Sequence, residues 1–350
     1  YRDAIDKQKA DTVSYRRFWQ PLASHLKGIK KVYLSPDGVY HQLNLQTLRN
    51  PATGKYLADE LEVQVVSSTR DLIGRPATKP VLSRAVLFGH PDYAEPGKSA
   101  PQPDLYAYTP APNRDSVQNA TRAVSGEKLR ALPASRAEVA QVGAILARSG
   151  VKVQTYTDAE ATERQLKQLQ SPSVLLVSTH GFFMQDVDRK PERTFAGFDT
   201  QKFVENPLLR SGLFMAGSQR TLDGKNEAAP TDTARTEDGI LTAYEAMNLN
   251  LDKTELVVLS ACETGLGEVK NGEGVYGLQR AFQTAGVRSV LMSLWKVDDT
   301  ATRLLITSFF ENWIKLKDKR AALKAAQAKL RANPKYSHPY YWGAFVLVGE

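Results

Sequence analysis

An α/β fold with a mainly parallel central sheet is predicted by two features of this sequence. The first is a pair of short apolar runs, Val174–Thr179 and Leu256–Leu259, whose composition suits strands buried on both faces of a parallel sheet. The second is the alternation of strand and helix patterns between residues 85 and 179, which is typical of parallel sheets covered by helices. Because 350 residues is long for one domain, we expect one large α/β unit with an additional subdomain.

The N-terminal part of the chain has less regular patterns. Residues 1–27 are predicted to be helical because they contain one apolar stripe, formed by Phe18, Trp19, Leu22 and Leu26. A strand is predicted over 32–34, with a turn at Pro36-Asp37-Gly38 and residues 41–45 returning as its partner, and another strand over 61–66. We therefore divide the chain into a helical lead-in (1–27), a flanking N-terminal subdomain (28–80) and a core (81–350).

The core is predicted to begin with a strand over 85–89, followed by an aperiodic loop over 91–130. Ser135-Arg136-Ala137-Glu138 has the spacing of a capping box and predicts a helix that ends near Gly150. The same patterns predict the remaining elements: strands over 151–156, 174–179, 213–215, 256–259, 290–294 and 342–349, and helices over 162–169, 241–247, 278–284, 300–313 and within 315–335.

A reactive side chain follows each of the two buried strand patterns. His180 comes directly after Thr179, and Cys262, the single cysteine, follows Leu259 in Ser260-Ala261-Cys262-Glu263-Thr264-Gly265. Since open parallel sheets bind ligands beyond the carboxyl ends of their strands, His180 and Cys262 should meet there if the strands are neighbours. The imidazole can then assist the thiol as a nucleophile and protonate a leaving amine. A lone cysteine or histidine is commonly structural, so the combination is what indicates catalysis.

These residues resemble the CHAT peptidases, caspase-like relatives of caspases and separases that are usually found behind tetratricopeptide repeats. The resemblance covers nearly everything from about residue 28 to the end, and it includes these further motifs: Ser35–Gly38, Ala161–Glu163, Gly272–Val275, Ala285-Gly286, Ser293–Asp299 and His338–Phe345. It implies a caspase-like α/β/α sandwich with residues 81–350 as the peptidase core. Ser260 and Glu263 replace the Gln and Arg that flank the caspase nucleophile, so caspase specificity for Asp is not expected.

The resemblance implies a cysteine endopeptidase in which Cys262 attacks the scissile carbonyl and His180 transfers protons. The backbone N–H groups of Gly181 and Cys262 are expected to face the developing oxyanion. The expected partners are a protein or peptide substrate and a regulatory partner bound through upstream repeats. Because the chain begins at Tyr1 rather than Met, we expect it to be part of a longer protein.

Three residues after the strand over 290–294 are candidates for substrate binding. Separases have a similar Leu-Trp followed by an acidic residue that lines the pocket for arginine, and Asp299 holds the matching place. The resemblance thus implies a buried carboxylate at a pocket floor, which would select Arg or Lys before the scissile bond. Asp298 and Trp295 are the other candidates. Two alternatives stay open. Asp298 or Asp299 could cap the helix that follows, and Trp295 could be a core aromatic residue.

Composition argues against several other classes of protein. No metal or organic cofactor is expected, because the sequence shows no ligand-rich cluster. The net charge of +8 is spread along the chain, and the densest basic segment has helical spacing, so no direct nucleic-acid contact is expected. No apolar stretch approaches the length of a membrane span, and no signal-peptide pattern opens the chain. A single cysteine permits no internal disulfide, which suits a cytoplasmic location.

The sequence motifs do not support dinucleotide binding or serine-hydrolase activity, and one other alternative to the peptidase hypothesis stays open. Gly272–Gly277 matches G-x-G-x-x-G, but twelve residues separate Ser260 from Gly272, and Glu268 and Glu273 would repel a pyrophosphate. We interpret that motif as a loop beside the cysteine. No G-x-S-x-G elbow of a serine hydrolase occurs. The main alternative is a catalytically silent caspase-like scaffold in a signalling or defence complex.

Overall fold

A computed structural model describes residues 1–73, 81–94, 128–183, 207–209, 211–223, 237–261, 273–296 and 298–349. Its largest element is an eight-stranded sheet with the strand order β1-β2-β11-β10-β9-β5-β3-β4. The strands are β1 (Lys31–Leu34), β2 (Glu62–Val65), β3 (Arg84–Pro91), β4 (Lys152–Asp158), β5 (Val174–Ser178), β9 (Leu256–Leu259), β10 (Ser289–Ser293) and β11 (Phe345–Gly349).

The sheet is mainly parallel, as predicted. The exception is the pairing of β10 with β11, which is antiparallel, so β1, β2 and β11 run opposite to the other five strands. Every residue of β5, β9 and β10 is buried, which fits strands covered on both faces. The carboxyl ends of β3, β4, β5, β9 and β10 therefore lie along one edge of the sheet.

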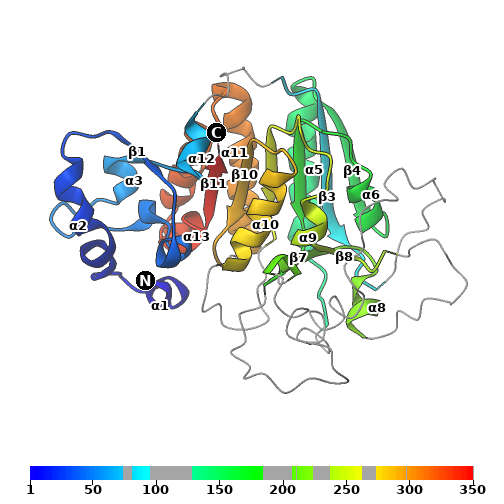
Figure 1. Ribbon diagram of the computed structural model, residues 1–350, viewed down its shortest axis with the longest axis horizontal. Helices are drawn as coiled ribbons and strands as arrows, with labels where there is room; N and C mark the ends of the chain where they lie inside the picture. Colours follow the sequence, from blue (N-terminus) through cyan, green and yellow to red (C-terminus); the bar gives the residue numbers. More distant parts are fainter. Residues whose placement is uncertain are drawn as a thin grey trace, which may run out of the picture.

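Helices cover both faces of the sheet (Figure 1). On one face α5 (Pro133–Arg148) packs against α11 (Asp299–Leu316), which packs against α12 (Lys319–Arg331). On the other face lie α6 (Glu163–Lys167), α9 (Ala243–Ala246) and α10 (Glu273–Thr284), as right-handed crossovers between parallel strands require. The predicted caspase-like α/β/α architecture is thus confirmed.

The N-terminal region lies at one end of the sheet, where it is blue in Figure 1. It contains α1 (Arg2–Asp6), a π-helical turn (Tyr15–Trp19), α2 (Gln20–Ala23) and α3 (Leu57–Glu60). It has its own apolar cluster, made of Trp19, Leu43, Leu45, Leu48, Leu57, Leu61 and Val63. Its strands nevertheless extend the main sheet, since β2 pairs with β11. The domain boundaries at 27 and 80 remain predictions.

The expected pairing of residues 32–34 with 41–45 is wrong. Residues Gly38–Gln42 form a 3₁₀ helix, and β1 instead pairs in parallel with β2, which lies about thirty residues further along the chain. The polar turn at Pro36-Asp37-Gly38 leads into that helix, whose start is capped by the Asp37 carboxylate accepting from the amide of Gly38.

The expected capping box at the start of α5 is also wrong. The helix begins at Pro133, and Ser135 lies inside its first turn. The Ser135 hydroxyl donates to the carbonyl oxygen of Ser178 at 2.7 Å and accepts from the amide of His90 at 2.8 Å. These contacts tie α5 to β3 and β5, so this side chain serves the sheet edge rather than the helix end.

A small antiparallel sheet follows His180 directly in the chain. It contains β6 (Gly181–Phe183), β7 (Ser211–Phe214) and β8 (Ile240–Thr242). The strand predicted near Leu213 is β7, whereas the helix predicted over 241–247 divides into β8 and the short α9. A separate apolar cluster lies beneath these strands, made of Tyr93, Phe182, Phe214, Leu222 and Ile240.

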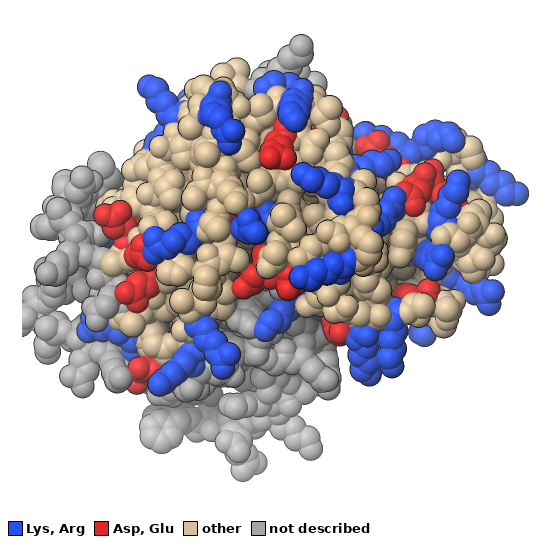
Figure 2. All heavy atoms as spheres, turned by 180° about the vertical axis from the view of Figure 1, so that it is seen from behind, with Lys and Arg blue, Asp and Glu red and all other residues tan. Residues whose placement is uncertain are grey.

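The surface carries basic and acidic side chains side by side. On the face shown in Figure 2, Lys and Arg side chains are distributed widely with Asp and Glu between them, which fits the scattered basic residues of the sequence. Within the described ranges, no helix is both long and apolar enough to cross a membrane.

Candidate active site

The candidate site lies where β5 and β9 end at the same edge of the sheet. The two strands are adjacent and parallel, and their last paired residues are Val177 and Leu259. His180 lies three residues after Val177, and Cys262 lies three residues after Leu259. The amide of Ser260 continues the ladder by donating to the carbonyl oxygen of Val177 at 2.9 Å. The neighbouring strands required by the Cys–His hypothesis are therefore present.

His180 is held in a defined orientation beneath the small sheet. Its side chain is only 3% exposed, and its ring lies 5.3 Å from the ring of Tyr93, centroid to centroid. Its Nε2 lies 2.7 Å from the carbonyl oxygen of Arg130. Because a carbonyl can only accept, Nε2 carries the proton, and Nδ1 is the acceptor of the neutral ring. A neutral imidazole in this tautomer can take a proton from a thiol.

Cys262 lies outside the described residues, which end on this side at Ala261. A Cβ atom built on Gly181 would lie 3.5 Å from the Cβ of Ala261, so the residue before Cys262 lies beside the residue after His180. Gly181 is the first residue of β6 and pairs with Leu213 of β7. The oxyanion site expected from the Gly181 and Cys262 amides remains a prediction.

A cavity of about 240 Å³ opens beside His180. It lies between the N-terminal ends of α5 and α11, at the carboxyl ends of β5 and β9. The side chains and backbone that line it come from four segments: Arg130–Glu138, Ser178–His180, Ser260, and Lys296 with Asp299 and Thr302. Its size suits one long side chain rather than a whole organic cofactor.

Glu138 is the buried acid of this cavity. It is 2% exposed, and its Oε2 accepts from the hydroxyl of Ser260 at 3.1 Å. Burial raises the pKa of Glu138 to about 7, although the nearby hydroxyls of Ser260 and Ser178 act in the opposite direction. Asp299 raises this pKa a little further, so the two carboxyl groups are close enough to interact.

The three residues predicted to bind substrate have different surroundings. Asp299 lines the cavity but is exposed, so the expectation of a buried carboxylate at the floor is wrong for this residue. Asp298 caps α11, since its Oδ1 accepts from the amide of Ala301 at 2.8 Å. One carboxylate thus caps the helix while the other faces the cavity.

Trp295 does not line the described cavity. It is 3% exposed, its indole N–H donates to the carbonyl oxygen of Tyr340 at 2.9 Å, and Tyr1 packs edge-on against its ring. Trp295 therefore has the surroundings of a core aromatic residue, which was the alternative interpretation. It does not form a wall of the described cavity.

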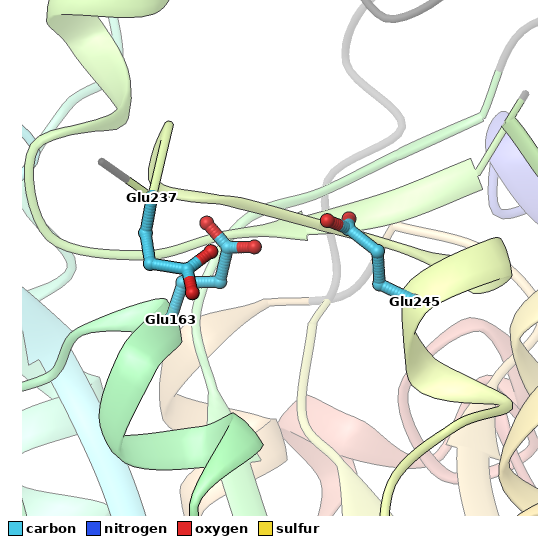
Figure 3. A group of neighbouring side chains, drawn as sticks. All are labelled: Glu163, Glu237 and Glu245. Carbon is cyan, nitrogen blue, oxygen red and sulfur yellow. The ribbon is translucent and has the colours of Figure 1, made fainter. Parts of the chain in front are cut away.

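Three glutamates gather on the opposite face of the sheet. Figure 3 shows the carboxylates of Glu163, Glu237 and Glu245 turned toward one another, and one oxygen of each lies within 4.8 Å of the others. No local sequence pattern indicates this cluster, because Glu163 lies far along the chain from Glu237 and Glu245. However, Lys167 Nζ lies at its centre, 2.5 Å from Glu163, 2.7 Å from Glu237 and 2.9 Å from Glu245. The lysine supplies the positive charge that a metal would otherwise supply.

The same cluster shapes the turn before β8. Glu163 is 1% exposed, and its Oε2 accepts from the amide of Gly239 at 3.0 Å. Gly239 has a φ of +79°, which favours glycine. Burial alone would lower the pKa of Lys167, but the surrounding carboxylates, above all Glu163, hold it well above its usual value. The cluster is therefore an ion network that ties α6, α9 and this turn together.

Sequence reasoning missed four contributors to the site: Tyr93, the Arg130 carbonyl, Glu138 and Thr302. A backbone carbonyl leaves no trace in the residue type, and Tyr93 was assigned to an aperiodic loop. Glu138 was visible only as part of the supposed capping box. Its Ser-x-x-Glu spacing matched a local pattern, whereas both polar side chains contact strand ends far away in the sequence.

The fold and the site define a class: a mainly parallel, caspase-like α/β protein with a histidine and a cysteine-bearing segment at adjacent strand ends. A family model described as the CHAT domain matches residues 12–350. The chain therefore belongs to the CHAT domain family, as its motifs predicted.

Curated relatives match a shorter stretch. Tetratricopeptide repeat protein 28 of Homo sapiens is 32% identical over 128 residues, which are 37% of this chain and 5% of that protein. Its Mus musculus counterpart is 32% identical over 111 residues, which are 32% of this chain and 4% of that protein. The chain thus spans only a small part of the length of these relatives.

Solved structures with a similar arrangement include the Arg-specific cysteine proteinase gingipain R, with a TM-score of 0.46 and 11% identity over 98% of this chain and 69% of that chain. A second is the complex of the Porphyromonas gingivalis RgpB pro- and mature domains, with a TM-score of 0.46 and 12% identity over 99% of this chain and 70% of that chain.

Proposed function

We propose that this chain is a cysteine endopeptidase that cuts protein substrates through Cys262 and His180. The observation that carries the proposal is the adjacency of β5 and β9, which end in register at the cavity beside His180. The Cys262 thiol would transfer its proton to Nδ1 of His180 while the sulfur attacks the scissile carbonyl carbon. The imidazolium would then protonate the leaving amine, and water would hydrolyse the thioester and restore the thiol.

The proposal includes three further features. The amides of Gly181 and Cys262 stabilise the oxyanion. Asp299 favours a basic residue before the scissile bond. Regulation comes through a tetratricopeptide repeat region, which is supported by the names of the two relatives. A cytoplasmic location is proposed from the single cysteine.

The test measures alkylation of Cys262 and cleavage of peptides in the same preparations. If His180 helps to form the thiolate, iodoacetamide should modify Cys262 faster than a free thiol near neutral pH, and His180→Ala should remove this advantage. Both Cys262→Ala and His180→Ala should abolish cleavage of a peptide library, while thermal unfolding stays almost unchanged.

The competing hypothesis is a catalytically silent caspase-like scaffold. It predicts equal alkylation rates with and without His180, and no cleavage of any library peptide by the unmodified chain. That pair of results would overturn the endopeptidase proposal.

A further inference from the structure

We propose that Glu138 and Thr302 form the floor of the substrate pocket, and that this floor binds the guanidinium group of an arginine side chain. The inference deepens the proposed function and rests on it only in treating the cavity as the substrate pocket. It replaces Asp299 with two residues from different helices as the main determinant of specificity.

Two buried polar atoms, both from residues that line this cavity, have no hydrogen-bond partner among the described residues. Glu138 Oε1 and Thr302 Oγ1 are buried, and neither has a hydrogen bond within the described part of the chain. Because both atoms are shielded from water, a guest in the cavity reaches them only when the two side chains turn toward it. Both residues line the cavity, and they are only 2% and 5% exposed. Because buried polar atoms in native proteins nearly always have partners, each unpaired atom requires an explanation. A ligand that fills the cavity would provide one.

The charges around the cavity favour a guest that donates hydrogen bonds. Among the charged residues that line the cavity, Arg130, Lys296 and Asp299 are exposed and Glu138 is buried, so the buried end of the lining is acidic. A guanidinium offers five N–H donors in a fixed plane, so it can reach a carboxylate oxygen and a hydroxyl oxygen together. This geometry favours arginine over lysine, whose ammonium is a compact point charge.

Other charged groups near Glu138 do not replace such a guest. Arg303 of α11 lowers the Glu138 pKa slightly, but its Nη1 donates to Gln141 at 3.2 Å. Lys296, after β10, is exposed. Arg130 lines the cavity before α5 but is exposed, and its backbone carbonyl oxygen accepts from Nε2 of His180 on the β5 side. None of them is recorded as a partner of Glu138 Oε1.

Binding should therefore depend on the ionisation of Glu138. A guanidinium binds the carboxylate better than the neutral acid, and burial gives Glu138 a pKa of about 7 in the empty pocket. Affinity for a guanidinium should rise as the pH rises through this value. His180 lines the same cavity and is kept in a Glu138 variant, so a comparison with that variant isolates the contribution of Glu138.

The experiment measures binding of n-butylguanidine and its neutral isostere n-butylurea by ligand-observed NMR titration. We expect n-butylguanidine to bind the unmodified protein more tightly at about pH 8 than at about pH 5.5, and n-butylurea to bind weakly at both values. Glu138→Gln keeps an oxygen for the Ser260 hydroxyl but removes the charge, so it should weaken n-butylguanidine binding at about pH 8 about tenfold or more and remove the part of the pH dependence that comes from Glu138.

Glu163→Gln is the matched control, because it makes the same change at a buried glutamate outside the cavity, and n-butylguanidine binding should be unchanged. Equal affinity for the two probes, or for the unmodified protein and Glu138→Gln, would overturn the inference. The pH dependence is measured on the unmodified protein, so this part of the test holds even if a variant fails to fold. Binding as expected without peptide cleavage would leave the pocket intact and overturn the endopeptidase proposal instead.

Discussion

Glu138 and Glu163 are buried to almost the same extent near the starts of successive helices, yet their surroundings are opposite. Glu163 is followed four residues later by Lys167, which pairs with it within the same helix. Four residues after Glu138 comes Val142, whose side chain belongs to the core. The Glu163 carboxylate therefore has its counter-charge in the local sequence, and the Glu138 carboxylate does not.

The contrast separates a structural acid from a candidate binding acid. A buried charge is expensive unless it is paired, so a fold that buries the Glu163 carboxylate beside two partly exposed carboxylates must also place a cation among them. Lys167 does this on one face of the sheet. On the other face of the sheet, the hydrogen-bond partners of Glu138 within the described ranges are hydroxyl groups, its pKa is raised by burial, and it borders a cavity. The missing counter-charge is what a basic substrate side chain would supply.

The largest effect is expected when the internal cation is removed. Lys167→Met leaves Glu163, Glu237 and Glu245 without their common partner, and we expect unfolding free energy to fall by roughly 3 to 5 kcal/mol. Chemical denaturation measures this change. Lowering the pH should recover part of the loss, because burial raises the Glu163 pKa and the protonated group no longer repels its neighbours.

Lys7→Met is the control for this variant. Lys7 pairs with Asp3 on the surface of α1, and both side chains are more than half exposed, so solvent screens the pair and its removal should change the unfolding free energy little. Equal losses in the two lysine variants would mean that the glutamate cluster does not depend on its central cation.

A second prediction concerns the pH dependence of stability at Glu138. Its pKa is raised in the folded protein from 4.5 to about 7, so between these values the folded state keeps a proton that the unfolded state has lost. Stability conferred by this group is therefore present below pH 4.5 and is lost as the pH rises to about 7, by on the order of 3 kcal/mol.

Unfolding free energies of the unmodified chain and of Glu138→Gln, measured across this range, give the contribution of the group. The variant should become relatively more stable as the pH rises. Parallel curves for the two proteins would mean that Glu138 already has a counter-charge, as Glu163 does, and the contrast between the two glutamates would fail.

Much of the sheet could be predicted because its strands are locally distinctive. The runs that became β3, β5, β9 and β10 are continuous and apolar, and a parallel sheet is the arrangement that buries them on both faces. The pairing of β2 with β11 could not be predicted, because its partners lie at opposite ends of the chain and neither short strand specifies the other.

The site residues of rare type were predicted from the sequence, and a site residue of common type was missed. A single cysteine and a histidine after matching strands are conspicuous in a sequence. Glu138 is one of many acidic residues, and a plausible local role as part of a capping box concealed its tertiary one. Whether an acid is buried without a counter-charge depends on contacts from β5, β9 and α11, which only the folded chain brings together.

The smallest effect is expected at Asp299, and it tests which carboxylate determines specificity. Because Asp299 is exposed, its interaction with a substrate cation should be worth about 1 kcal/mol or less, as for other solvent-screened pairs. Asp299→Asn should lower kcat/KM for peptides with arginine before the scissile bond by at most about fivefold, with unchanged alkylation of Cys262. Asp298→Ala should instead cost about 1 kcal/mol of stability without altering the preference among peptides, because it removes only a helix cap. A loss of about thirtyfold or more in Asp299→Asn, combined with little change in Glu138→Gln, would reverse the assignment and make the exposed carboxylate the main determinant.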